Sequence, residues 1–168
     1  PLYGQVDKNN DYHDVGLLIL TERVDLPLGN LPPEGFLDQL YADGLLYDGE
    51  ERAEIIVVGY GDAVSWPPPE VVDDGNGRWV GISEFQRLMK AWLFLSQNHT
   101  QDLEGTCFGD SGGPGFYKDD NDTLWLVGIT GWGDSQCVAT GFDYRVDTAS
   151  TLDFISEYLP PPYQSPHR

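Results

Sequence analysis

A glycine-rich stretch around one serine has the composition of a nucleophile loop. The residues Glu-Gly-Thr-Cys-Phe-Gly-Asp-Ser-Gly-Gly-Pro-Gly-Phe span 104–116 and place Ser111 directly after Asp110. The glycines allow the backbone to turn tightly and to bring N–H groups close to a substrate carbonyl. A serine hydroxyl becomes an effective nucleophile when a neighbouring base takes its proton. The stretch therefore predicts acyl-transfer chemistry at Ser111, and that chemistry requires a base.

None of the three histidines in the chain is an evident base for Ser111. His13 is adjacent to Asp14. Neighbouring residues of an extended segment point to opposite faces, so the two side chains cannot easily act together at one site. His99 precedes the glycine-rich stretch, and His167 lies in a polar tail, so both are typical of surface residues. The local sequence therefore does not identify the base of Ser111.

The hexapeptide Gly-Asp-Ser-Gly-Gly-Pro, with a cysteine four residues before the serine, resembles the signature of the trypsin-like (chymotrypsin-fold) serine peptidases. The segments 130–137, Thr-Gly-Trp-Gly-Asp-Ser-Gln-Cys, and 141–155 resemble the same family. The resemblance covers nearly all of the chain and is strongest to secreted bacterial members. It accounts for only about two-thirds of a family domain, so we expect the N-terminal third of that domain to be missing.

The resemblance implies a role for each catalytic residue. Ser111 is the nucleophile, and Asp14, which precedes an apolar segment, is the acid that orients the histidine. The histidine itself is expected upstream of Pro1. The N–H groups of Gly109 and Ser111 are expected to form the oxyanion hole. Asp110 is expected to pair with a new N-terminal amine that processing releases.

The family pattern also assigns a substrate-binding region. Gly105 is expected at the floor of the primary pocket, and an open, uncharged pocket suits large apolar side chains. Asp143 lies near the back of the pocket, where a carboxylate would instead favour basic side chains. The full set of expected substrate-binding residues is Gly105, Thr106, Phe108, Gly131, Trp132, Gly133, Gly141 and Asp143.

The two cysteines, Cys107 and Cys137, allow a disulfide, two free thiols or half of a metal site. The family resemblance implies the disulfide. The acidic residues 118–123, Lys-Asp-Asp-Asn-Asp-Thr, could suit calcium, but their place between two strands favours a solvated hairpin turn. We expect no metal and no cofactor.

Short apolar and aromatic segments separated by Gly, Asn and Asp predict an all-β architecture with a helix at its end. Residues 13–24 and 53–61 are expected as strands, 62–79 as a long surface loop, and 147–160 as a helix capped by Asp147 or Thr148 and stopped by Pro160. The later strands are expected at 79–89, 91–98, 113–118, 123–133 and 141–147. The resemblance implies a chymotrypsin-like double β-barrel, of which this chain holds the end of the first barrel, 1–25, a connector, 26–50, and the complete second barrel with the helix, 51–168.

The charge balance limits the partners. The chain carries 28 acidic and 9 basic residues, a formal net charge of −19, which repels nucleic acid and anionic membrane surfaces. No apolar run approaches the roughly 18 to 20 residues of a membrane span. The family resemblance implies a secreted, monomeric endopeptidase for protein or peptide substrates, which we expect to be inactive as this fragment alone. A peptide-binding module of the same fold that has lost catalysis is the alternative, and an acidic structural protein with a chance motif is a weaker one.

Overall fold

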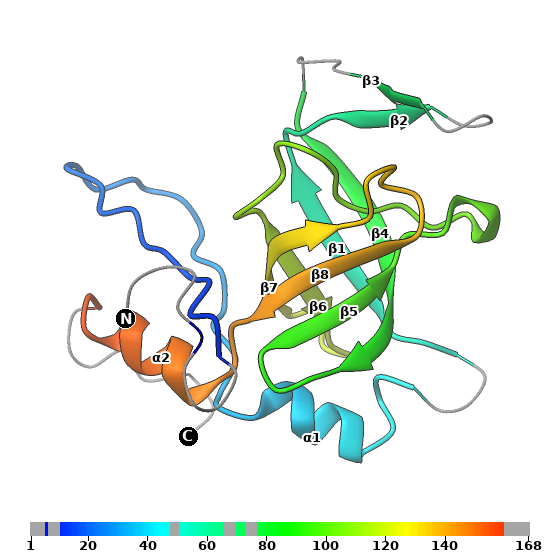
Figure 1. The fold of residues 1–168 in the computed structure, drawn as a ribbon. Coiled ribbons are helices and arrows are strands. Elements are labelled where there is room, and N and C mark those ends of the chain that lie inside the picture. The colour runs from blue at the N-terminus through cyan, green and yellow to red at the C-terminus, as the bar shows by residue number, and fades with distance from the viewer. Residues whose placement is uncertain (1–5, 7–10, 48–50, 66–69, 73–76, 160–168) are drawn as a thin grey trace.

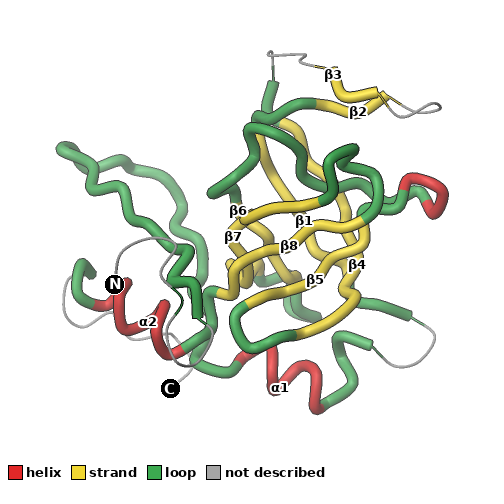
Figure 2. The backbone as a smooth tube through the Cα atoms, in the orientation of Figure 1, coloured by secondary structure: helices red, strands yellow, loops and turns green. Residues whose placement is uncertain are grey.

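The computed structural model describes residues 6, 11–47, 51–65, 70–72 and 77–159 (Figure 1). His167 and the expected helix stop, Pro160, lie outside the described residues. Strands dominate and are joined by loops, and in the described part of the chain one α-helix precedes the first strand and another follows the last (Figure 2). The expected all-β class with a C-terminal helix is confirmed.

Six strands close into one antiparallel barrel in the order β1-β4-β5-β8-β7-β6, with β6 pairing back to β1. Their bounds are β1 Glu54–Gly59, β4 Trp79–Leu88, β5 Trp92–Ser96, β6 Pro114–Lys118, β7 Leu124–Gly133 and β8 Thr140–Arg145. These strands occupy the segments that the sequence predicts from 53 onward. Closure leaves none of the six strands as a free edge, because each pairs with a neighbour on both sides.

The barrel core follows from the two-residue period of its strands. In β1, for example, Ile55 and Val57 are buried while Glu54 is exposed. The buried cluster consists of Leu37, Leu40, Leu46, Ile55, Val57, Phe85, Leu93, Leu95, Trp125 and Val127. Its first two members come from α1, Phe36–Ala42, which covers one end of the barrel.

An ion-pair network fastens α1 to the last strand. The buried guanidinium of Arg145 donates to Asp147 at 2.8 Å and to Asp38 of α1 at 2.6 Å. The Asp147 carboxylate also accepts the N–H of Leu37 at 2.8 Å. Burial would lower the pKa of Arg145, but Asp147 and Asp38 outweigh it and raise that pKa, so the guanidinium stays charged.

The C-terminal helix, α2, spans Ala149–Ser156 and begins as the sequence predicts. Thr148 is its N-cap, and the Thr148 hydroxyl accepts the N–H of Thr151 at 3.3 Å. Thr151 and Ile155 are its buried residues, so a narrow face of α2 packs against the rest of the molecule. The second proposed cap, Asp147, instead pairs with Arg145.

The expected strand at 13–24 is wrong: this segment forms no strand and runs outside the barrel (Figure 1, blue). Leu18 and Ile19 are 93% and 70% exposed. A strand needs a hydrogen-bonding neighbour, and all six barrel strands already have two. The apolar run therefore has neither a ladder partner nor a covering layer among the described residues.

The expected surface loop at 62–79 contains a small hairpin that the sequence did not predict. β2, Ala63–Ser65, and β3, Glu70–Val72, pair antiparallel and form a separate sheet at the edge of the barrel. The β-branched residues Val64, Val71 and Val72 favour an extended backbone, which explains the pairing.

Candidate active site

Ser111 lies in a tight turn between the segment 97–110 and β6. Gly109 and Gly112 have φ of 95° and 85°, a backbone region that favours glycine. The turn is tied to the barrel, because Gly112 N–H donates to Thr130 O at 2.8 Å and Gly113 N–H donates to Asp110 O at 2.8 Å. Ser111 itself is exposed. The glycines thus let a rigid barrel present one serine to solvent.

Two backbone N–H groups at this turn have no hydrogen-bond acceptor among the described residues. The N–H groups of Gly109 and Ser111 donate to no other residue that the structure describes, whereas Asp110 N–H donates to Cys107 O at 3.1 Å. Exposed backbone donors beside a nucleophile are what an oxyanion hole requires.

The carboxylate of Asp110 is turned inward from the same loop. It is 9% exposed and accepts the N–H of Gly61 at 2.7 Å and of Cys107 at 2.9 Å. A Cβ on Gly59 would lie 1.8 Å from the Asp110 carboxylate oxygen, and one on Gly61 would lie 2.7 Å from it. The two glycines at the end of β1, Gly59 and Gly61, therefore make room for this carboxylate. No ion pair satisfies Asp110 in the described part of the chain.

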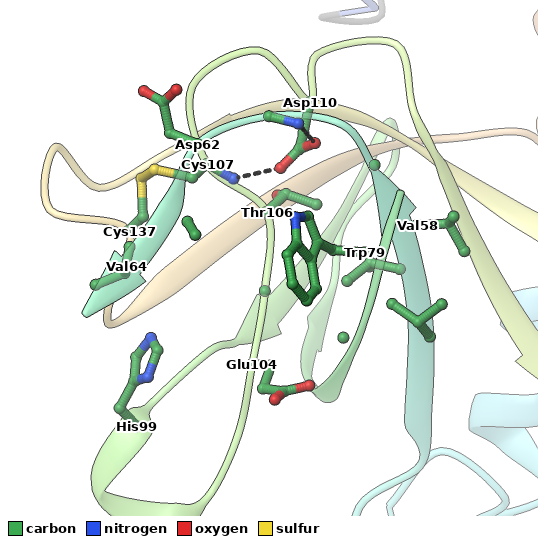
Figure 3. Close-up of a pocket in the computed structure, with 17 residues that line it drawn as sticks. Val58, Asp62, Val64, Trp79, His99, Glu104, Thr106, Cys107, Asp110 and Cys137 are labelled. Carbon is green, nitrogen blue, oxygen red and sulfur yellow. Dashed lines mark hydrogen bonds between the residues drawn. A yellow bond between two sulfur atoms is a disulfide. The ribbon is translucent and has the colours of Figure 1, made fainter. Parts of the chain in front are cut away.

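Asp110 faces a cavity of about 180 Å³ between its own segment, β1, β2 and β4 (Figure 3). The cavity walls combine apolar residues, such as Val57, Val64 and Trp79, with the acidic residues Asp62 and Glu104. Figure 3 shows Asp110 at one side and His99 at the other. Ser111 and Trp132 do not line this cavity. It is therefore a recess of mixed apolar and acidic lining, and Ser111 is not part of its wall.

The described histidines do not contact Ser111. His13 lies beside Asp11, with its N–H donating to the Asp11 carboxylate at 2.9 Å and its ring 3.9 Å away. His99 begins the short 3-10 helix η1, His99–Gln101, and lines the cavity. Neither histidine forms a hydrogen bond to Ser111 that would mark it as the base.

The segment that carries Asp14 is anchored on the barrel. Asp11 accepts hydrogen bonds from Tyr144 of β8 and Ser150 of α2. The Tyr12 ring packs edge-on against Trp92 at 5.8 Å, and Trp92 packs against Trp132 at 6.3 Å. Burial raises the pKa of Asp14. The loop of the expected triad acid and the expected substrate edge thus share one aromatic contact, Trp92.

A β-bulge shapes the expected substrate edge. The β7–β8 register shifts between Thr130 and Trp132, so Gly131 is left without an opposite residue. The Trp132 ring stacks on Phe142 with 3.5 Å between ring centroids and remains 54% exposed. A Cβ on Gly131 would lie 2.7 Å from the Trp92 ring. The bulge and the glycine together bring Trp132 to the surface.

Two expected pocket residues converge on one buried side chain. A Cβ on Gly105 would lie 2.0 Å from the Gln97 side-chain oxygen, and one on Gly141 would lie 3.2 Å from it. The same oxygen accepts the N–H of Thr106 at 3.1 Å. Phe108 is exposed, and Gly133 lies opposite Gly141 in the β7–β8 ladder.

Asp143 is completely buried. A Cβ on Gly115 or Gly128 would lie 2.3 Å or 2.6 Å from the Asp143 side chain, so both neighbours must be glycine. Neither carboxylate oxygen has a hydrogen-bond partner among the described residues. Burial raises the pKa of Asp143 to about 7, and the nearby Thr130 hydroxyl lowers it only in part.

Cys107 and Cys137 form a disulfide with a Cα–Cα distance of 5.3 Å. The predicted pairing is confirmed, and it ties the nucleophile segment to the loop after β7. The acidic hairpin at 118–123 is also confirmed as a turn between β6 and β7. There the Asp119 carboxylate accepts the N–H groups of Asn121, Thr123 and Trp125.

These features agree with a comparison against protein families. Residues 40–155 match the family described as Trypsin. The chain belongs to the trypsin family. A trypsin-like serine peptidase would act on protein or peptide substrates, and the disulfide of this chain fits an extracellular protein. In the part of the chain that the structure describes, no helix is both long and apolar enough to cross a membrane.

Sequence reasoning missed three residues that shape this trypsin-family site. Gly59 and Gly61 make room for Asp110, and the signal was the Gly-Tyr-Gly that ends β1. Gln97 follows the apolar residues of β5, where nothing in the local pattern shows whether the side chain points inward.

Proposed function

We propose that this protein is a serine endopeptidase in which Ser111 is acylated, Asp14 orients the catalytic histidine, and that histidine is contributed by a residue outside 1–168. The observation that carries the proposal is the Ser111 turn. It combines an exposed hydroxyl with two backbone N–H groups that have no described acceptor, within a chain of the trypsin family.

In this mechanism the histidine takes the Ser111 proton as the hydroxyl attacks the substrate carbonyl. The carbonyl oxygen becomes an oxyanion and accepts hydrogen bonds from the N–H groups of Gly109 and Ser111. The same histidine then donates its proton to the leaving amine, and water releases the acyl group. Asp14 stabilises the imidazolium. The anchoring of its loop through Tyr12 and Trp92 supports this role, because it holds the loop on the same aromatic cluster as Trp132.

In this proposal Asp110 regulates activity by binding a new N-terminal ammonium group. Its carboxylate faces a cavity lined by apolar and acidic residues and has no described cation partner. A new N-terminal ammonium group with an apolar side chain matches the charge and lining of that cavity. Its binding would hold the Asp110 turn, and with it the Gly109 and Ser111 N–H groups, in one geometry.

The substrate backbone is proposed to lie along Gly131, Trp132 and Gly133, where the β7 bulge exposes the edge of the strand. The substrate side chain next to the cleaved bond is proposed to enter the region of Gly105, Thr106, Phe108 and Gly141. We further propose a secreted monomer in which residues 1–25 complete a first barrel and 26–50 connect it to the second.

The test compares two forms of the protein: residues 1–168 alone, and a form that includes any residues that its gene encodes before Pro1. A fluorophosphonate probe labels only an activated serine. We expect labelling and amide hydrolysis in the longer form, and loss of both in Ser111→Ala. The 168 residues alone should be slower by about 10⁶, the cost of removing the base in a comparable triad.

Hydrolysis by residues 1–168 that disappears in Ser111→Ala would contradict the external histidine. A longer form that folds and binds peptides but never labels would contradict catalysis and leave a peptide-binding module.

A further inference from the structure

The primary pocket of this chain is not the open space that its glycines suggest. Gly105 and Gly141 have no side chains, but Gln97 fills the room between them. The Gln97 oxygen lies 2.0 Å from the place of a Cβ on Gly105, and the Gln97 Cβ lies 2.4 Å from it. Gln97 is 1% exposed. The glycines are therefore needed for Gln97, whose side chain occupies the space that a side chain at Gly105 would take.

The orientation of the Gln97 amide is fixed by its neighbours. Thr106 N–H is a donor, so the amide atom 3.1 Å from it must be the oxygen, Oε1. The Gln97 backbone is held as well, because its N–H donates to Ala139 O at 3.0 Å, just before β8. The other end of the amide, Nε2, is then a donor with two hydrogens.

That donor has no use inside the protein. Gln97 Nε2 is buried and has no hydrogen-bond partner in the described part of the chain. A buried donor without an acceptor is costly, and a ligand that supplies an acceptor recovers this cost. A site of this kind rejects ligands that leave its donor unpaired.

We propose that Gln97 is the floor of the primary pocket and selects an uncharged side chain with a primary amide, Asn or Gln, by donating hydrogen bonds from Nε2. This inference rests on the proposed function and names its substrate class. It replaces both expectations from the sequence, a large apolar side chain and a basic one.

The alternatives fit this floor less well. Lysine and arginine end in donors, which would face the Nε2 donor. An aromatic side chain offers no comparable acceptor and needs the depth that Gln97 occupies. A carboxylate would accept the bond, but the net charge of −19 opposes binding of an anion. A neutral amide oxygen avoids all three penalties.

The experiment measures binding, so that it does not depend on catalysis. The protein carries Ser111→Ala and includes any residues that its gene encodes before Pro1. Labelled tetrapeptides differ only in their last residue, which is Gln, Met, Lys or Phe. We expect the Gln peptide to bind about 10-fold more tightly than the Met peptide, which is similar in length but offers no amide oxygen.

Gln97→Met should abolish this difference, because it keeps the length of the side chain and removes the donor. Gln101→Met, on the exposed η1 helix, is the matched control and should keep the difference. Gln97→Glu retains an oxygen for Thr106 N–H. This second variant tests the inference if Gln97→Met does not fold. At about pH 8.5 the Gln97→Glu variant should prefer the Lys peptide.

Equal binding of the Gln and Met peptides, or an unchanged preference in both Gln97 variants, would overturn the inference alone. Failure of all four peptides to bind would overturn the inference together with the proposed peptide groove. A Gln preference in a protein that never hydrolyses peptides would support the inference and contradict the proposed catalysis.

Discussion

Two buried carboxylates lie near the candidate active site, and their hydrogen-bonding surroundings differ. Asp110 accepts two backbone N–H groups. Asp143 is completely buried, and neither of its oxygens has a described hydrogen-bond partner. The difference arises from the neighbours: the turn at Gly61 offers Asp110 a donor, whereas Gly115 and Gly128 offer Asp143 only space.

Asp143→Asn tests the consequence of this burial for stability. The folded pKa is about 7 and the ordinary value is 3.8, so between these pH values the folded state keeps a proton that the unfolded chain has lost. The stabilisation from the neutral carboxyl is full below about pH 4, falls as the pH rises toward 7, and is then lost. Asp143→Asn should therefore raise the free energy of unfolding by a few kcal/mol at pH 8 and change it little at pH 4.

Thermal unfolding at both pH values measures this effect, with the exposed Asp122→Asn as the control. An Asp143→Asn variant that is equally destabilised at pH 4 and pH 8 would mean that the carboxyl group makes a hydrogen bond that amide replacement breaks.

At the scale of elements, the barrel strands were predictable because each combines β-branched or aromatic residues with turn residues at both ends. The segment 13–24 has the same composition, yet it forms no strand. The composition of a segment shows whether it is suited to strand pairing. Whether a neighbouring strand is free to pair with it depends on the rest of the fold. The position of Gln97 could not be predicted for a similar reason, since its burial depends on glycines 8 and 44 residues away in the sequence, Gly105 and Gly141.

The loop after β7 gives an element-scale prediction. The Asp134 carboxylate accepts the N–H groups of Gln136, Val138, Ala139 and Thr140, at 2.9 to 3.3 Å. Burial alone would raise the pKa of Asp134, but these four bonds outweigh it and lower the pKa. The Asp134 contribution to stability is therefore full above the ordinary pKa and is lost as the pH falls through the folded value.

Asp134→Asn should lower the free energy of unfolding by about 1 to 2 kcal/mol at pH 7, because an amide N–H₂ would face backbone donors. The deficit should shrink at pH 2 to 3. Asp153→Asn, on the exposed face of α2, is the control for loss of one negative charge. If the deficit persists undiminished in acid, then the amide group facing the backbone donors destabilises the variant, and the loss of the Asp134 charge does not.

At the scale of the whole molecule, the chain combines a closed barrel with an apolar segment that nothing described covers. Leu18, Leu20 and Leu28 are each at least 65% exposed, although such residues are usually buried. The proposed first barrel would account for this exposure, because its remaining parts would cover 13–24 and bury it. The same segment carries Asp14, so covering it and completing the catalytic triad would be one structural event.

Leu18→Lys should change the stability of residues 1–168 and of the longer form by different amounts. In residues 1–168 alone, Leu18 is 93% exposed, so the substitution should change the free energy of unfolding by no more than about 0.5 kcal/mol. In the form that includes any residues that its gene encodes before Pro1, the side chain should be buried, and Lys should then destabilise by several kcal/mol. Chemical denaturation of both forms measures this, with Glu22→Lys as a charge control. Equal, small effects in the two forms would show that the segment stays outside any barrel, and the proposed first domain would be wrong.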